Sequence, residues 1–90
     1  MTWQIEGFIW SDWVIEKIIT KHRVSPEEVE EAFYTTPHKV LQAGAGKYRL
    51  YSRTEDGRHL FIVFVWESHH VKIVSARDMT DAERRFYSRK

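Results

Sequence analysis

The chain of 90 residues contains no cysteine, and this absence excludes two kinds of site. Without thiols there is neither a disulfide framework nor a thiolate-ligated metal centre. A chain this short buries only about 60–65% of its unfolded surface, so its core must be compact and rich in large side chains. Aromatic residues, at 14% of the sequence, provide for such a core. The lack of cysteine also agrees with a reducing compartment.

Long hydrophobic segments are missing as well. The longest apolar run, residues 60–66, is far too short to span a bilayer, and residues 1–10 lack the basic start and apolar centre of a signal peptide. No linker, repeat or low-complexity tract interrupts the sequence. We therefore expect residues 1–90 to form a single soluble domain in the cytoplasm, without membrane contact.

The net charge of +1 conceals an uneven distribution of charged residues. Residues 1–36 contain three cationic and seven acidic side chains, whereas residues 37–90 contain eleven cationic and six acidic ones. This asymmetry predicts an acidic face and a basic face. A basic face can bind nucleic acid or an acidic partner, or it can be solvated without any ligand.

Helix caps and turn residues divide the sequence into eight elements. The sequences Ser25-Pro26-Glu27-Glu28 and Thr80-Asp81-Ala82-Glu83 both have the pattern of a capping box and predict helix starts. Asp56-Gly57 predicts a hairpin. The expected strands are residues 3–10, 39–43, 47–54, 59–67 and 71–76, and the expected helices are residues 11–22, a second one from Pro26 that stops before Thr36-Pro37, and a third after Thr80.

The resulting order, β-α-α-β-β-β-β-α, predicts an α+β fold with an antiparallel sheet of four to five strands, two N-terminal helices and one C-terminal helix. The segment HLFIVFVWE is apolar on both faces and is expected to be central in the sheet. Ser11 or Asp12 is expected to cap the first helix.

The expected strand KYRLYSR places three cations and one aromatic ring on one face. Because successive side chains alternate, Lys47, Arg49, Tyr51 and Arg53 share a face, with neighbours about 6.5–7 Å apart. Such a face suits a phosphate backbone and a stacked base. A solvated outer sheet face is the structural alternative.

The C-terminal sequence is also cationic. Arg77 follows the last expected strand and lies next to the start of the last helix, where backbone N–H groups favour an anion. Its guanidinium can bind a phosphate bidentately and stabilise charge in a transition state, or it can form a structural bridge to Asp78 or another acid. The helix that follows contains Arg84 and Arg85, which either bind RNA or are surface charge.

His22, at the end of the first expected helix, is the best-placed histidine for general acid or base catalysis. Imidazole titrates near neutral pH, and the adjacent Lys21 would tend to depress its pKa. His22 also continues the apolar stripe of its helix, so a half-buried structural histidine is the alternative. The remaining histidines have no metal-ligand spacing, and we expect no metal or other cofactor.

Four segments together resemble one family. They are FIW, KHRVSPEEVEEAF, GRHLFIVFVWE and VKIVSARDMTDAERRFY, and they are similar to BrnT-type toxins of type II toxin–antitoxin systems, whose fold is similar to RelE-like ribonucleases. The resemblance extends from Phe8 to Tyr87. In two places the sequence departs from the family pattern: Arg23 replaces the usual glycine, and Tyr48-Arg49 replaces the commoner Arg-Tyr order.

The resemblance implies a metal-independent endoribonuclease that inhibits translation and is neutralised by a co-encoded antitoxin. That antitoxin would bind operator DNA, which the toxin would reach only through it. RNA provides its own nucleophile, the 2′-OH, so the protein must provide proton transfer and cations. The resemblance and the residue chemistry together assign catalysis to Lys21, His22 and Arg77. RNA binding is assigned from the strand face to Lys47, Arg49, Tyr51 and Arg53, and from the C-terminal charge to Arg84 and Arg85.

Three hypotheses therefore remain, and one of them, a structural protein without a ligand, would leave the basic residues scattered. An RNA-cleaving toxin requires Lys21, Arg49, Arg53 and Arg77 to converge on one concave surface. A non-catalytic module on the same fold would use the basic surface only to bind RNA or an acidic protein.

Overall fold

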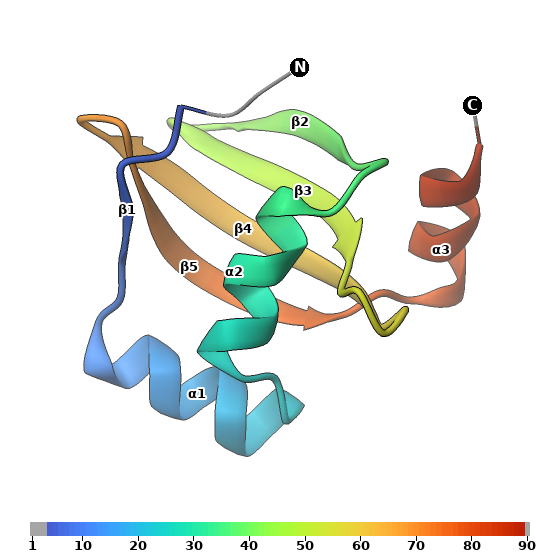
Figure 1. Cartoon of the computed structure of the whole chain (residues 1–90), viewed down its shortest axis with the longest axis horizontal. Helices are drawn as coiled ribbons and strands as arrows, with labels where there is room; N and C mark the ends of the chain where they lie inside the picture. Colours follow the sequence, from blue (N-terminus) through green and yellow to red (C-terminus); the bar gives the residue numbers. More distant parts are fainter. Residues whose placement is uncertain (1–3, 90) are drawn as a thin grey trace.

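The computed structural model describes residues 4–89 and contains three helices and five strands (Figure 1). In chain order they are β1 (Gly7–Ile9), α1 (Asp12–His22), α2 (Pro26–Tyr34), β2 (Lys39–Gly44), β3 (Lys47–Arg53), β4 (His59–Glu67), β5 (His70–Asp78) and α3 (Asp81–Ser88). This is the predicted order and confirms the α+β class. The first strand is shorter than expected, and residue 3 of that prediction lies outside the described residues.

The sheet has the strand order β1-β5-β4-β3-β2, so β4 is central, as predicted. The pairs β2–β3, β3–β4 and β4–β5 are antiparallel, but β1 pairs with β5 in parallel. The sheet is therefore mixed, and the expectation of a wholly antiparallel sheet is corrected at β1. A parallel neighbour becomes possible because α1, α2 and three strands separate β1 from β5 along the chain.

Both predicted capping boxes are present. The Ser25 hydroxyl accepts a hydrogen bond from the Glu28 amide, and Thr80 and Glu83 form the same pair at the start of α3. At α1 the expectation fails in part: Ser11 occupies the N-cap position, but its side chain makes no capping hydrogen bond. The α1 C-cap is Arg23, with φ of 55°, in the left-handed region that glycine adopts more readily.

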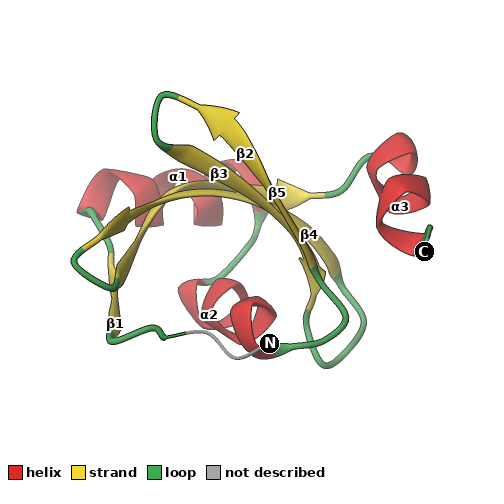
Figure 2. Cartoon of the chain, turned by 90° about the horizontal axis from the view of Figure 1, so that it is seen from above, coloured by secondary structure: helices red, strands yellow, loops and turns green. Residues whose placement is uncertain are grey.

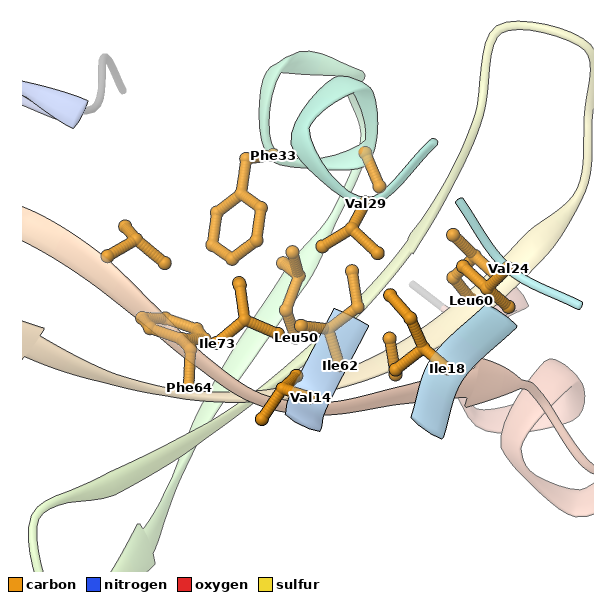
Figure 3. Close-up of a cluster of buried hydrophobic side chains, with 13 residues drawn as sticks. Val14, Ile18, Val24, Val29, Phe33, Leu50, Leu60, Ile62, Phe64 and Ile73 are labelled. Atoms are coloured by element: carbon orange, nitrogen blue, oxygen red, sulfur yellow. The ribbon is translucent and has the colours of Figure 1, made fainter. Parts of the chain in front are cut away.

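The main core lies between the helices α1 and α2 and one face of the sheet (Figure 3). The sheet curves around α2, which lies on its concave side (Figure 2). Phe33 of α2 packs edge-to-face on Phe64 of β4, with ring centroids 5.0 Å apart. In the same layer the buried Ser52 hydroxyl donates a 2.7 Å hydrogen bond to the Ala32 carbonyl oxygen. Tyr48, Leu50 and Ser52 thus face the core side, which leaves the alternate β3 residues on the convex side.

Helix α3 packs on the other side of the sheet from α2 (Figure 2). It contains no buried residue, in contrast to α2 with three. Its attachment therefore depends on a few specific contacts rather than on a shared core. No helix within residues 4–89 is long and apolar enough to cross a membrane.

Candidate functional site

The convex face of the sheet brings chemically useful residues from four strands into one row. Tyr51 of β3 lies opposite Lys39 of β2 and Phe61 of β4, and Phe61 in turn lies opposite Arg77 of β5. Directly opposed residues have Cβ atoms about 4.5–5.5 Å apart. Arg77 and the cationic strand β3 therefore share this face, as the sequence predicted.

Arg77 is bound to an acid on this face. Its two terminal nitrogens donate hydrogen bonds of 2.8 and 2.9 Å to the two carboxylate oxygens of Glu83, and one also reaches the Asp78 carbonyl oxygen at 3.1 Å. The guanidinium also lies over the Phe61 ring, 4.3 Å from its centroid. This is the bridging arrangement that the sequence left open, with Glu83 as the acid. A bidentate phosphate contact through the two terminal nitrogens of Arg77 requires that Glu83 first releases them.

The contact between Arg77 and Glu83 shifts the pKa of both groups. The hydrogen bond from Arg77 lowers the pKa of Glu83, against burial, which raises it. The same hydrogen bond raises the pKa of Arg77. Both groups therefore stay charged across the physiological range.

Tyr51 is not accessible for base stacking. Its side chain is 7% exposed, and its ring packs against Phe61 and against Phe86 of α3, at centroid distances of 5.3 and 4.8 Å. The expectation of an open stacking platform at Tyr51 does not hold while α3 is docked, because Phe86 covers the ring. Lys39 completes the attachment: its ammonium donates a hydrogen bond to the Phe86 carbonyl oxygen and lies 4.4 Å from the Phe86 ring centroid.

Two cationic depressions adjoin each other at α3, one on the helix itself and one between the helix and the adjoining ends of β2 and β3. They share Ser88 and Arg89, and we call the two together the α3 groove. Its lining residues are Pro37, His38, Lys39, Arg53, Arg84, Arg85, Tyr87, Ser88 and Arg89. Five of these are Lys or Arg and none is acidic. The groove thus includes three of the cations predicted to bind RNA, together with Lys39 and Arg89.

His59 adjoins the α3 groove. It pairs with Arg53 across the β3–β4 ladder, and its ring packs edge-to-face on Tyr87 with centroids 5.4 Å apart. Partial burial lowers the pKa of His59, and the charges of Arg84 and Arg53 lower it further. A hydrogen bond to the Gly57 backbone acts in the opposite direction. No motif in the sequence marks His59 as a site residue.

Lys47 and Arg49 continue the cationic face along β3, away from α3. Both side chains are exposed, and Arg49 pairs with Val63 and Leu41 in the ladders. The face that they share with Arg53 is convex, because the sheet curves towards α2 on its other side (Figure 2). The expected concave surface shared by Lys21, Arg49, Arg53 and Arg77 is not formed, because of these four only Arg53 lines the α3 groove in the part of the chain that the structure describes.

Lys21 and His22 belong to a different neighbourhood, at the C-terminal end of α1. Arg58 donates hydrogen bonds to the carbonyl oxygens of His22 and Arg23, at 3.1 and 2.8 Å. It also forms ion pairs with Asp78 at 2.7 Å and Glu28 at 3.1 Å. The Arg58 hydrogen bond, and to a lesser extent the charge of His22, lower the pKa of Asp78.

Arg58 thus joins α1, α2 and β5, a structural role that the sequence analysis did not foresee. Lys21 is exposed and His22 half-buried beside this network. Among residues 4–89 no hydrogen bond or ion pair joins either of them to the α3 groove. In the same part of the chain no three His, Asp or Glu side chains are grouped so as to hold a metal ion.

Comparison with known proteins agrees with this architecture. Residues 10–83 match the family described as the ribonuclease toxin BrnT of type II toxin–antitoxin systems. A solved structure with a similar fold is that of the ribonuclease toxin BrnT of Brucella abortus, at a TM-score of 0.69 and 15% identity, covering 83% of this chain and 97% of the other. A search of curated proteins finds no match. Because the family match spans most of the chain, this protein belongs to the BrnT family of type II toxins.

Proposed function

We propose that this protein is an endoribonuclease toxin that binds single-stranded RNA along the α3 groove and the adjoining face of β3. The observation that carries the proposal is the collection of five cationic side chains, without an acid, in one groove. Membership of a family described as ribonuclease toxins supports it. Phosphates in the groove would be neutralised by Arg53, Arg84 and Arg85, and Lys47 and Arg49 would extend the track along the strand.

Cleavage of RNA at such a site needs no metal ion in principle. The 2′-OH attacks the adjacent phosphorus, and guanidinium groups stabilise the charge that grows on the phosphoryl oxygens. Arginine suits this task because its planar donors match phosphate oxygens and its charge is permanent. Arg77 joins this set if RNA or a change at α3 releases it from Glu83.

The family description also supports a protein partner, because a type II system pairs its toxin with an antitoxin protein. We infer that the toxin acts in the cytoplasm, inhibits translation by cleaving RNA, and is neutralised by a co-encoded antitoxin. The antitoxin would provide any contact with operator DNA. Co-expression with the neighbouring reading frame should restore growth that expression of the toxin alone arrests.

The test of the RNA-cleaving function uses the purified protein and a defined single-stranded RNA in excess EDTA. We expect cleavage products with a 2′,3′-cyclic phosphate and a 5′-hydroxyl, and a large loss of rate in Arg53→Gln. Lys72→Gln is the matched control, because Lys72 lies on β5 and pairs with Glu67 at 3.5 Å. Binding without cleavage would support the alternative, a non-catalytic RNA-binding module, and would contradict the enzyme.

A further inference from the structure

The residue that accepts the proton from the 2′-OH has no evident candidate among the arginines of the α3 groove. An arginine stays protonated at every physiological pH and cannot act as a base. Tyr87 lines the groove, but its hydroxyl donates a 2.7 Å hydrogen bond to the Pro37 carbonyl oxygen. Two histidines remain as candidates for the base. His38 lines the groove, but its Nδ1 lies 2.9 Å from the Thr35 carbonyl oxygen, whereas His59 adjoins the cationic lining opposite Arg53.

We propose that His59 is the general base of this site, an inference that rests on the proposed RNA-cleaving function. His59 stands at the first position of β4, opposite Arg53 on β3, and against the Tyr87 ring on α3. Both of these neighbours line the groove. A phosphate held by Arg53 would thus place the ribose of the same nucleotide within reach of the imidazole.

The surroundings of His59 favour the neutral ring, which packs against Tyr87. The groups that face it are Arg53 from β3, Arg84 and Tyr87 from α3, and the backbone of Gly57 from the β3–β4 turn. Burial and the two arginines lower its pKa, so the unprotonated ring predominates at neutral pH. The hydrogen bond to the Gly57 backbone favours the protonated ring, as a bond from ring N–H to a carbonyl oxygen does. In the neutral ring one of the two nitrogens has no proton and can accept one.

The reaction balances with these groups. The acceptor nitrogen of His59 takes the 2′-OH proton while the 2′ oxygen forms a bond to phosphorus and the bond from phosphorus to the 5′ oxygen breaks. The 5′ oxygen takes a proton from water, and the imidazolium returns its proton to the hydroxide left behind. Arg53 and Arg84 stabilise the charge on the phosphoryl oxygens and the neutral state of the ring together.

The test is the pH dependence of kcat/KM for RNA cleavage in EDTA. The wild-type rate should rise with pH through the pKa of His59 in the free enzyme, which lies below the usual imidazole value, and then level off. We call this rising part of the profile the acidic limb. His59→Gln should lose about 10²–10⁴-fold in rate and lose this acidic limb. His69→Gln is the matched control, because His69 is exposed in the β4–β5 turn. This variant should cleave RNA at the wild-type rate.

A second variant separates catalysis from folding. Arg84→Gln removes one positive charge that acts on His59, so the acidic limb should move to higher pH. Arg85→Gln, on the same helix but not among the charges that act on the ring, should leave the limb in place. A purely structural histidine would not produce this difference.

The outcomes distinguish the two proposals. The first outcome is that the wild type cleaves RNA, but His59→Gln cleaves at the same rate or Arg84→Gln does not move the acidic limb. In that case His59 is not the base, and the ribonuclease function stands. If the wild type does not cleave any RNA under these conditions, the proposed function fails and the role of His59 falls with it. Titration of the His59 ring by NMR gives an independent check, since a pKa above the usual value would overturn the proposal.

Discussion

Glu83 combines two roles at the start of α3. One of its oxygens accepts hydrogen bonds from both the Thr80 amide and Arg77, and the other binds Arg77 again. A single carboxylate thus closes the capping box of α3 and attaches that helix to the end of β5. The capping box is predictable from sequence spacing because it involves only adjacent residues. The ion pair with Arg77 is not, because it forms only when the helix folds back over the sheet.

This double use predicts a pH-dependent contribution to stability. Because the folded-state pKa of Glu83 is lowered, its contribution is present above the unfolded value near 4.5 and is lost as the pH falls through the folded-state pKa. Glu83→Gln should therefore be less stable than the wild type at pH 7, and the gap should narrow at pH 3. Urea unfolding at the two pH values measures it. An equal gap at both would show that the carboxylate charge does not stabilise the fold.

The buried hydroxyl of Ser52 allows a second prediction at this scale. Ser52→Ala leaves the Ala32 carbonyl oxygen in the core without its side-chain donor, which should cost about 1–3 kcal/mol of unfolding free energy. Ser75 is half-buried on the convex side of β5, and Ser75→Ala should change the unfolding free energy by less than about 0.5 kcal/mol. Similar values for both variants would mean that the Ser52 hydrogen bond contributes nothing.

Among the elements, α2 and α3 begin with the same chemistry but attach to the molecule in different ways. Both have complete capping boxes, yet α2 buries three side chains in the core and α3 buries none. The caps and the Asp56-Gly57 hairpin were predictable because each depends on a few adjacent residues. The parallel pairing of β1 with β5 and the Arg58 network were not, because they depend on contacts between residues distant in sequence.

The difference between the two helices is measurable. Ser25→Ala should lower the global unfolding free energy by about 1 kcal/mol, because α2 cannot fray without opening the core. Thr80→Ala should instead speed amide hydrogen exchange within α3 while protection in β4 stays unchanged, because α3 opens locally. If Thr80→Ala lowered the protection of β4 amides as much as Ser25→Ala does, α3 would be part of the cooperative core.

At the scale of the whole molecule, the acidic helix α2 lies on the opposite side of the sheet from α3 (Figure 2), whose residues line the cationic groove. Three of the α2 glutamates are used within the fold: Glu28 binds Arg58, Glu30 accepts from the Trp10 indole, and Glu31 accepts from the Glu55 amide. The groove cations Arg53, Arg84, Arg85 and Arg89 form no ion pair within residues 4–89. The sequence predicted this separation from charge counts alone, but it did not locate the groove, which exists only because α3 packs on the convex side.

RNA binding should therefore depend on salt through the groove. For an uncleavable 2′-O-methyl RNA, the slope of log K against log salt is negative, and each lost phosphate contact reduces its magnitude by about 0.7. The double variant Arg53→Gln/Arg89→Gln should therefore reduce the magnitude by about 1.4. Lys72→Gln should leave the slope unchanged. Fluorescence anisotropy between 50 and 300 mM salt, roughly the range over which such affinities fall, measures the slopes. Equal slopes for all three proteins would place the RNA elsewhere.

The central claim is that RNA lies in the α3 groove and not beside Lys21 and His22 at the end of α1. The most direct measurement is NMR mapping of the uncleavable RNA on the ¹⁵N-labelled protein. The account predicts that backbone amide shifts concentrate at Arg53, His59 and Tyr87 and leave Lys21 and His22 unmoved. Shifts confined to the end of α1, with the α3 groove unaffected, would contradict it.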